Sequence, residues 1–174
     1  ANGVTVLRQG WGVEPLTEGQ AACVSTMSYN EYWVVRDAGY SPEQLTVFKY
    51  QSEGAATLED GLYVHEKNLS DAAFKDKMVR FVRASMKGWK YAEANPKEAA
   101  MIILDNDDAG VQTEKHQVRM MGEIAKLTAG SNGSLDPADY ERTVKVLMSG
   151  DSDPVITKKP SGAWTNEITN AALN

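Results

Sequence analysis

The sequence is poor in several residue types, and each shortage excludes a class of protein. Its single cysteine, Cys23, rules out an internal disulfide. Because Cys23 lies in the apolar run at residues 21–24, we expect a small buried side chain rather than a nucleophile. No stretch approaches the ~18 consecutive apolar residues of a membrane span. The 18 basic residues against 24 acidic residues give a net charge of −6, which argues against a nucleic-acid partner because phosphates need a basic surface.

Familiar catalytic and metal-binding motifs are also missing. There is no G-x-S-x-G elbow, no G-x-G-x-x-G turn and no P-loop. The two histidines, His65 and His116, lie in different segments, so a histidine-based zinc site would need several carboxylates to converge. The segment D-N-D-D-A-G at residues 105–110 resembles a calcium loop, but Ala109 and His116 occupy its fifth and twelfth positions, where oxygen ligands are needed. We therefore expect neither a metal nor a bound cofactor.

The pattern of apolar residues predicts an α/β fold with a helical remainder. Short apolar segments flanked by turn residues predict strands at residues 4–7, 21–27, 45–48 and 62–64, separated in the first part by helical segments at 14–19 and 28–38. This alternation favours a largely parallel sheet. From residue 70 onward the apolar residues recur at helical spacing, which predicts helices at 70–94, 95–104, 113–129 and 163–173. A further helix opens at Asp136, because Asp136 and Asn95 both precede proline as N-caps do.

The stretch S-T-M-S-Y-N-E-Y-W, residues 25–33, follows the apolar segment at 21–24 and has two interpretations. In the structural one, Ser28 and Glu31 form a capping box, while Tyr32 and Trp33 anchor the core. In the functional one, the stretch lies beyond the carboxyl end of a strand, where open α/β sheets bind ligands. Glu31 would then accept two parallel hydrogen bonds from an amidine-like edge. The candidate ligand-binding residues are Ser25, Thr26, Ser28, Tyr29, Asn30 and Glu31.

Four segments of the chain resemble one known family. E-G-Q-A-A-C-V-S-T-M-S-Y-N-E-Y, D-A-G-Y, T-L-E-D-G-L-Y-V and F-V-R-A-S-M-K-G-W-K-Y-A-E-A-N-P-K-E-A-A are similar to the later half of solute-binding proteins of the thiamine-pyrimidine-precursor type. That family groups periplasmic receptors of ABC importers with the yeast pyrimidine synthase, and it lies close to receptors for sulfonates, taurine and nitrate.

The resemblance implies a periplasmic binding protein-like (type II) fold, in which two α/β lobes hold a solute in the cleft between them. Residues 1–56 would belong to the second lobe, residues 57–64 would cross back, and residues 65–174 would form the mostly helical C-terminal part of the first lobe. A missing N-terminal portion of the same fold would be a partner, so the chain should expose apolar surface where that portion packs. The other partner would be an ABC permease, and the location periplasmic or exported and membrane-anchored.

By resemblance, Glu31 in the series Tyr29-Asn30-Glu31 recognises the amino edge of an aminopyrimidine, and the protein is a receptor rather than an enzyme. A carboxylate in the first turn of a helix also disfavours an anionic solute. The alternatives are a sulfonate, taurine or nitrate receptor, and a pyrimidine synthase-like enzyme. Such a synthase would pair a cofactor-bearing lysine and a histidine with a cysteine-rich motif, and here Cys23 stands alone.

Overall fold

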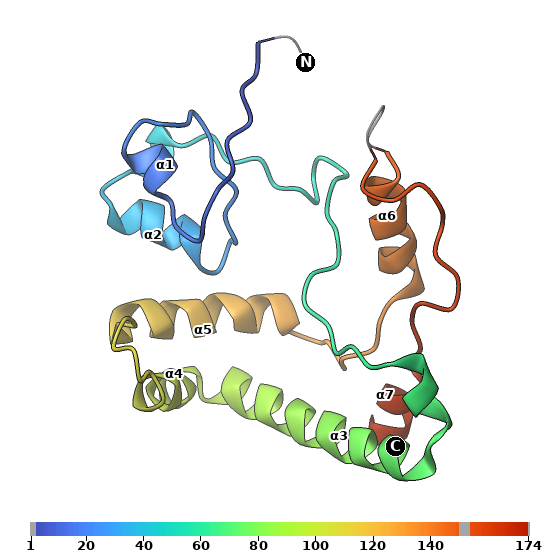
Figure 1. Ribbon diagram of the computed structural model, residues 1–174. Helices are drawn as coiled ribbons and strands as arrows, with labels where there is room; N and C mark the ends of the chain where they lie inside the picture. The colour runs from blue at the N-terminus through green and yellow to red at the C-terminus, as the bar shows by residue number, and fades with distance from the viewer. Residues whose placement is uncertain (1–2, 150–153, 174) are drawn as a thin grey trace. The chain divides into compact units, whose positions relative to one another are not determined.

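A computed structural model describes residues 3–149 and 154–173, and within these residues the chain is built of helices (Figure 1). The N-terminal part holds two short α-helices, α1 (Glu14–Thr17) and α2 (Glu31–Asp37), followed by two 3₁₀ segments, Pro42–Gln44 and Glu66–Ser70. The remainder holds longer α-helices: α3 (Ala72–Ala94), α4 (Pro96–Asp105), α5 (Glu114–Thr128), α6 (Pro137–Leu147) and α7 (Glu167–Leu173).

The predicted α/β class, and with it the type II two-lobed fold, is wrong for the described residues, because none of them forms a β-strand. The segments at 4–7, 21–27, 45–48 and 62–64 have strand-like composition but no neighbouring strand to complete a ladder of backbone hydrogen bonds. Many of their apolar side chains lie in solvent: Val6 is 89% exposed, Phe48 69% and Tyr63 86%.

The chain divides into two compact units, each built from two separate stretches of sequence. Unit 1 comprises Ala1–Thr46 and Tyr91–Ala129, and unit 2 comprises Val47–Lys90 and Gly130–Asn174. In unit 1, α4 packs against α5, and the buried side chains of this unit include Val13, Val35, Ala99, Ala100 and Gln117. In unit 2 the buried apolar side chains include Ala56, Val144 and Ala172.

The starts of the later helices follow the predicted capping signals in part. Asp136 precedes α6 and its carboxylate accepts from the backbone N–H of Ala138 at 2.7 Å, as predicted. Asn95 does occupy the N-cap position of α4, but its side chain caps nothing. Its amide instead donates to the backbone carbonyl of Tyr91 at the end of α3, at 3.0 Å. In α4 and α6 alike the N-cap residue and the proline after it mark the start of the helix, although only Asp136 caps it through its side chain.

Within unit 2, α7 is held on α3 by polar contacts. Arg83 donates from Nε to the carbonyl of Ala172 at 3.0 Å and from Nη2 to that of Ala171 at 3.1 Å. Lys75 pairs with Glu167 at the other end of α7, at 2.6 Å. A guanidinium group on the last carbonyls of a helix satisfies acceptors that have no partner within the helix.

Many large apolar side chains of the described residues stay exposed. Phe81 and Trp89 of α3 are both about half exposed, and α3 has no buried residue. The prediction for Cys23 is wrong, because its side chain is exposed. The segment that carries it is not a buried strand, so nothing covers the thiol.

Candidate functional site

The start of α2 brings Asn30 and Glu31 together in unit 1. Asn30 is the N-cap and Glu31 the first residue of the helix, and the carboxylate of Glu31 turns back to accept from the backbone N–H of Met27 at 2.8 Å. The predicted capping box, with Ser28 as N-cap and the helix starting there, is therefore wrong. Residues 28–30 form a turn, and the Glu31 carboxylate binds the backbone N–H of Met27, the residue just before this turn.

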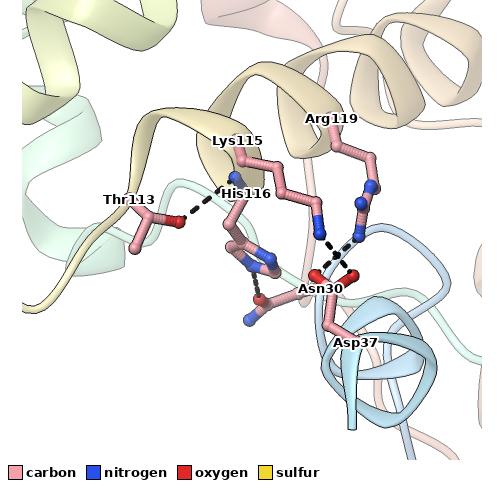
Figure 2. Close-up of polar contacts among 6 residues, drawn as sticks. All are labelled: Asn30, Asp37, Thr113, Lys115, His116 and Arg119. Atoms are coloured by element: carbon pink, nitrogen blue, oxygen red, sulfur yellow. Dashed lines mark hydrogen bonds and ion pairs between the residues drawn. The ribbon is translucent and has the colours of Figure 1, made fainter. Parts of the chain in front are cut away.

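A short chain of hydrogen bonds joins this helix start to α5. The Asn30 amide Nδ2 donates to Glu31 Oε1 at 3.1 Å. Asn30 Oδ1 lies 2.7 Å from Nε2 of His116, as Figure 2 shows. An ionised carboxylate only accepts, so the amide nitrogen must face Glu31 and the amide oxygen must face the imidazole. It follows that His116 carries a hydrogen on Nε2 and donates it to Asn30.

The position of His116 is set by the capped start of α5. Thr113 is the N-cap, and its hydroxyl oxygen accepts from the backbone N–H of His116 at 3.3 Å. This bond fixes the first turn of the helix and directs the imidazole toward Asn30, as Figure 2 shows. Asn30, Glu31 and His116 are all partly buried, so each is held by its surroundings while remaining in contact with solvent.

At the C-terminal end of α2, a cluster of charges connects this helix to the first turns of α5. Asp37 accepts from Lys115 Nζ at 3.0 Å and from Arg119 Nη1 at 2.9 Å (Figure 2). The hydrogen bond from Arg119, followed by that from Lys115, lowers the pKa of the Asp37 carboxyl below its ordinary value. Both cations are thereby engaged by a carboxylate of the same unit.

Aromatic contacts complete the face of α2 that meets α5. The Arg119 guanidinium lies 4.9 Å from the centroid of the Trp33 ring, a cation–π contact. Tyr32 meets Trp33 edge to face, with ring centroids 5.3 Å apart. One face of Trp33 is therefore covered by protein, and its indole nitrogen is buried without a hydrogen-bond partner.

The other predicted site residues precede Asn30 and Glu31 in the chain. Ser25, Thr26 and Ser28 are exposed and Tyr29 is partly buried. Ser25 is fixed through its backbone, because the Gln9 side chain accepts from its N–H and donates to its carbonyl, both at 2.8 Å. The structure thus joins two of the six predicted residues directly, and places the others on the segment that leads to them.

The comparison with protein families decides which kind of protein carries this arrangement. A family described as NMT1/THI5 like matches residues 1–99 of the 174, which include Asn30 and Glu31. The chain belongs to the NMT1/THI5-like family. This confirms the resemblance on which the ligand-site prediction was based, and membership indicates a solute-binding or related protein in general. No curated protein and no solved structure matches the chain.

In this NMT1/THI5-like chain, sequence reasoning missed every residue that α5 contributes. His116, Lys115 and Arg119 lie beyond the matched residues and about 80 positions from their partners on α2. The sequence analysis weighed His116 only as a metal ligand.

Among the described residues no group of histidine, cysteine and carboxylate side chains could hold a metal ion. Nor does any described helix have the length and apolarity to cross a membrane.

Proposed function

We propose that this NMT1/THI5-like protein is a non-enzymatic receptor for a small nitrogenous aromatic solute, such as an aminopyrimidine. The observation that supports this proposal is the carboxylate of Glu31, which is held rigidly and still has acceptor capacity. One oxygen accepts from Asn30 and the other from the backbone of Met27. Each carboxylate oxygen accepts up to two hydrogen bonds, so one lone pair on each oxygen remains for the amino group of a solute.

The charges around the candidate site favour a neutral or cationic solute over an anion. Glu31 places a negative charge at the start of α2, and an anion bound within ~4–6 Å of it would be repelled or would have to bind with a proton. Lys115 and Arg119, the cations that α5 presents to α2, are both paired with Asp37. A sulfonate or nitrate would therefore have to displace an ion pair to be neutralised by either of them.

The proposal extends to the transport system around the receptor. We propose that the protein acts outside the cytoplasm, in the periplasm or anchored on the outer side of a membrane, and delivers its solute to an ABC permease. The exposed apolar side chains of residues 4–7, 45–48 and 62–64 support a further N-terminal portion of the protein as a packing partner. Family membership alone includes both receptors and synthases, so the transport role is the part that needs testing.

Calorimetric titration of the full-length protein tests the proposal. Cytosine serves as the aminopyrimidine, taurine and nitrate serve as the anions, and Glu31→Gln is compared with Glu53→Gln, a matched change at an exposed glutamate. We expect wild type and Glu53→Gln to bind cytosine alike and Glu31→Gln to lose at least tenfold in affinity, about the contribution of one charged hydrogen bond. Tight taurine or nitrate binding that improves in Glu31→Gln would contradict the proposal.

A separate measurement addresses the synthase alternative. The protein is incubated with pyridoxal phosphate, and the absorption spectrum is followed while product is sought. A receptor forms neither a Schiff-base band nor product. Either result would show that a lysine of this protein reacts with the cofactor, and the non-enzymatic proposal would be wrong.

A further inference from the structure

We propose that Asn132 is a site of spontaneous deamidation, at which the folded loop converts the asparagine to aspartate and isoaspartate. The pair Asn132-Gly133 lies in the loop between α5 and α6, just after the chain passes from unit 1 to unit 2. Both residues are exposed. The reaction needs only this chain and water, so it is independent of any solute.

The reaction takes place within the main chain of the loop. The backbone nitrogen of Gly133 attacks Cγ of Asn132, the new N–Cγ bond closes a succinimide ring, and the side-chain nitrogen leaves as ammonia with the proton that Gly133 releases. Water then opens the ring. Opening at Cγ gives aspartate, and opening at the main-chain carbonyl gives isoaspartate. The net change takes up water and releases ammonia, with no oxidation or reduction.

The hydrogen bonds of the loop hold Asn132 in a conformation that favours this attack. Its Oδ1 accepts from the backbone N–H of Ser134 at 2.9 Å, which folds the side chain back over its own main chain as an Asx-turn. Cγ is thereby kept close to the nitrogen of the intervening Gly133, as proximity catalysis requires. The negative charge that develops on Oδ1 during the attack is stabilised by the same N–H of Ser134.

The fold requires glycine at position 133, and this requirement leaves the attacking nitrogen unhindered. The φ of Gly133 is +78°, and a Cβ placed there would lie 2.8 Å from Sδ of Met86 on α3. The N–H of Gly133 donates to the hydroxyl of exposed Ser131 at 3.2 Å, where base in the solvent can take its proton. The conformation that demands glycine therefore removes the steric protection that a larger residue would give Asn132.

Isoaspartate should disturb the loop more than aspartate, because its main chain passes through Cβ and Cγ and gains an extra carbon. The loop is fixed directly after the reaction site. Leu135 donates from its backbone N–H to Asn166 Oδ1 at 3.0 Å, and the Asn166 amide donates to the carbonyl of Leu135 at 2.9 Å. These two bonds tie the loop to the segment before α7, so a longer main chain at residue 132 should strain them.

Peptide mapping by mass spectrometry of the full-length protein tests the proposal. Wild type is incubated at physiological temperature, folded and in guanidinium chloride, at neutral and mildly alkaline pH. Aspartate and isoaspartate should accumulate at Asn132 in the folded protein at least as fast as in the unfolded chain, and faster in alkali. Asn132→Gln, which would have to close a larger ring, should stay unmodified.

Asn106 is the matched control within the same molecule. It is also exposed, but its amide donates to the carbonyl of Ile102 at 2.8 Å and its successor is Asp107. In the folded protein it should react about tenfold more slowly than Asn132 or slower still, the effect of lost orientation and of a larger neighbour. Equal modification of Asn106 and Asn132 would show that exposure alone decides, and the proposal would be wrong.

Two further results would count against the proposal. If folded wild type keeps Asn132 intact while the unfolded chain is modified, the loop protects the asparagine instead of promoting its reaction. Urea unfolding then compares wild type aged until isoaspartate predominates with Asn132→Asp, which has the new charge without the extra carbon. The aged protein should unfold at a lower urea concentration, and equal midpoints would refute the predicted strain at Leu135.

Discussion

Replacing Asp37 by asparagine should weaken the attachment of α2 to α5 in a way that depends on pH. The carboxylate accepts from Arg119 at 2.9 Å and from Lys115 at 3.0 Å, and the asparagine side chain would keep the shape but lose the charge. The Asp37 side chain is 37% exposed and that of Lys115 is 71% exposed, so solvent screens much of the attraction. We therefore expect a loss of only about 1 kcal/mol in the free energy of unfolding at neutral pH, the upper range for partly exposed pairs.

The pH dependence follows from the lowered pKa of Asp37. A carboxyl whose pKa is lower in the folded than in the unfolded state adds stability above its unfolded pKa of about 3.9, and this stability is lost as the pH falls through the folded pKa. The difference between wild type and Asp37→Asn should therefore be constant from about pH 7 down to about pH 5. It should then shrink progressively in more acidic solution.

Urea unfolding at a series of pH values measures this difference directly. The matched control is Asp76→Asn, which breaks an ion pair with Arg80 within α3, where both side chains are about two-thirds exposed. That change should cost only about 0.3–0.5 kcal/mol. A wild-type advantage over Asp37→Asn that stays constant in acid would show that the asparagine disturbs packing rather than charge. A loss no larger than that of the control would refute a special role for the cluster.

Three further predictions concern single groups. Arg36→Met removes two guanidinium nitrogens that are buried without a partner, so chemical unfolding should show equal or slightly higher stability, and a loss above about 2 kcal/mol would show that the charge has an important partner. Thr113→Ala removes the N-cap of α5 and should cost about 1 kcal/mol by the same method, whereas Thr113→Ser should cost much less. The hydrogen bond to Glu98 raises the pKa of the Tyr91 phenol, so any stability it contributes is present at neutral pH and lost as the pH rises through the folded pKa. An ultraviolet titration should show Tyr91 ionising at lower pH in Glu98→Gln, and an unchanged titration would contradict that contact.

Local sequence signals predicted the helices well and the strands wrongly, for a physical reason. The helix at 70–94 and the start at Asp136 follow from spacing and capping, which act within a few residues. The segment at 45–48 has equally clear apolar character, but a strand needs a partner from elsewhere in space, and its own residues do not specify one. At the site, Asn30 and Glu31 are neighbours and could be predicted together. Their connection to His116 spans 86 positions, and nothing in the local pattern of either segment indicates it.

The discontinuous sequence of unit 1 affects the order of events during synthesis. The segment that ends at Thr46 leaves the ribosome first, but the helix that holds Asn30 and Asp37 in place begins only at Glu114. At about 5–20 residues per second, the 86 positions between Asn30 and His116 take roughly 4–17 s to translate. Throughout that interval Asn30, Trp33 and Asp37 have no α5 to contact. A nascent chain of this protein should therefore bind chaperones until residues beyond 119 have emerged.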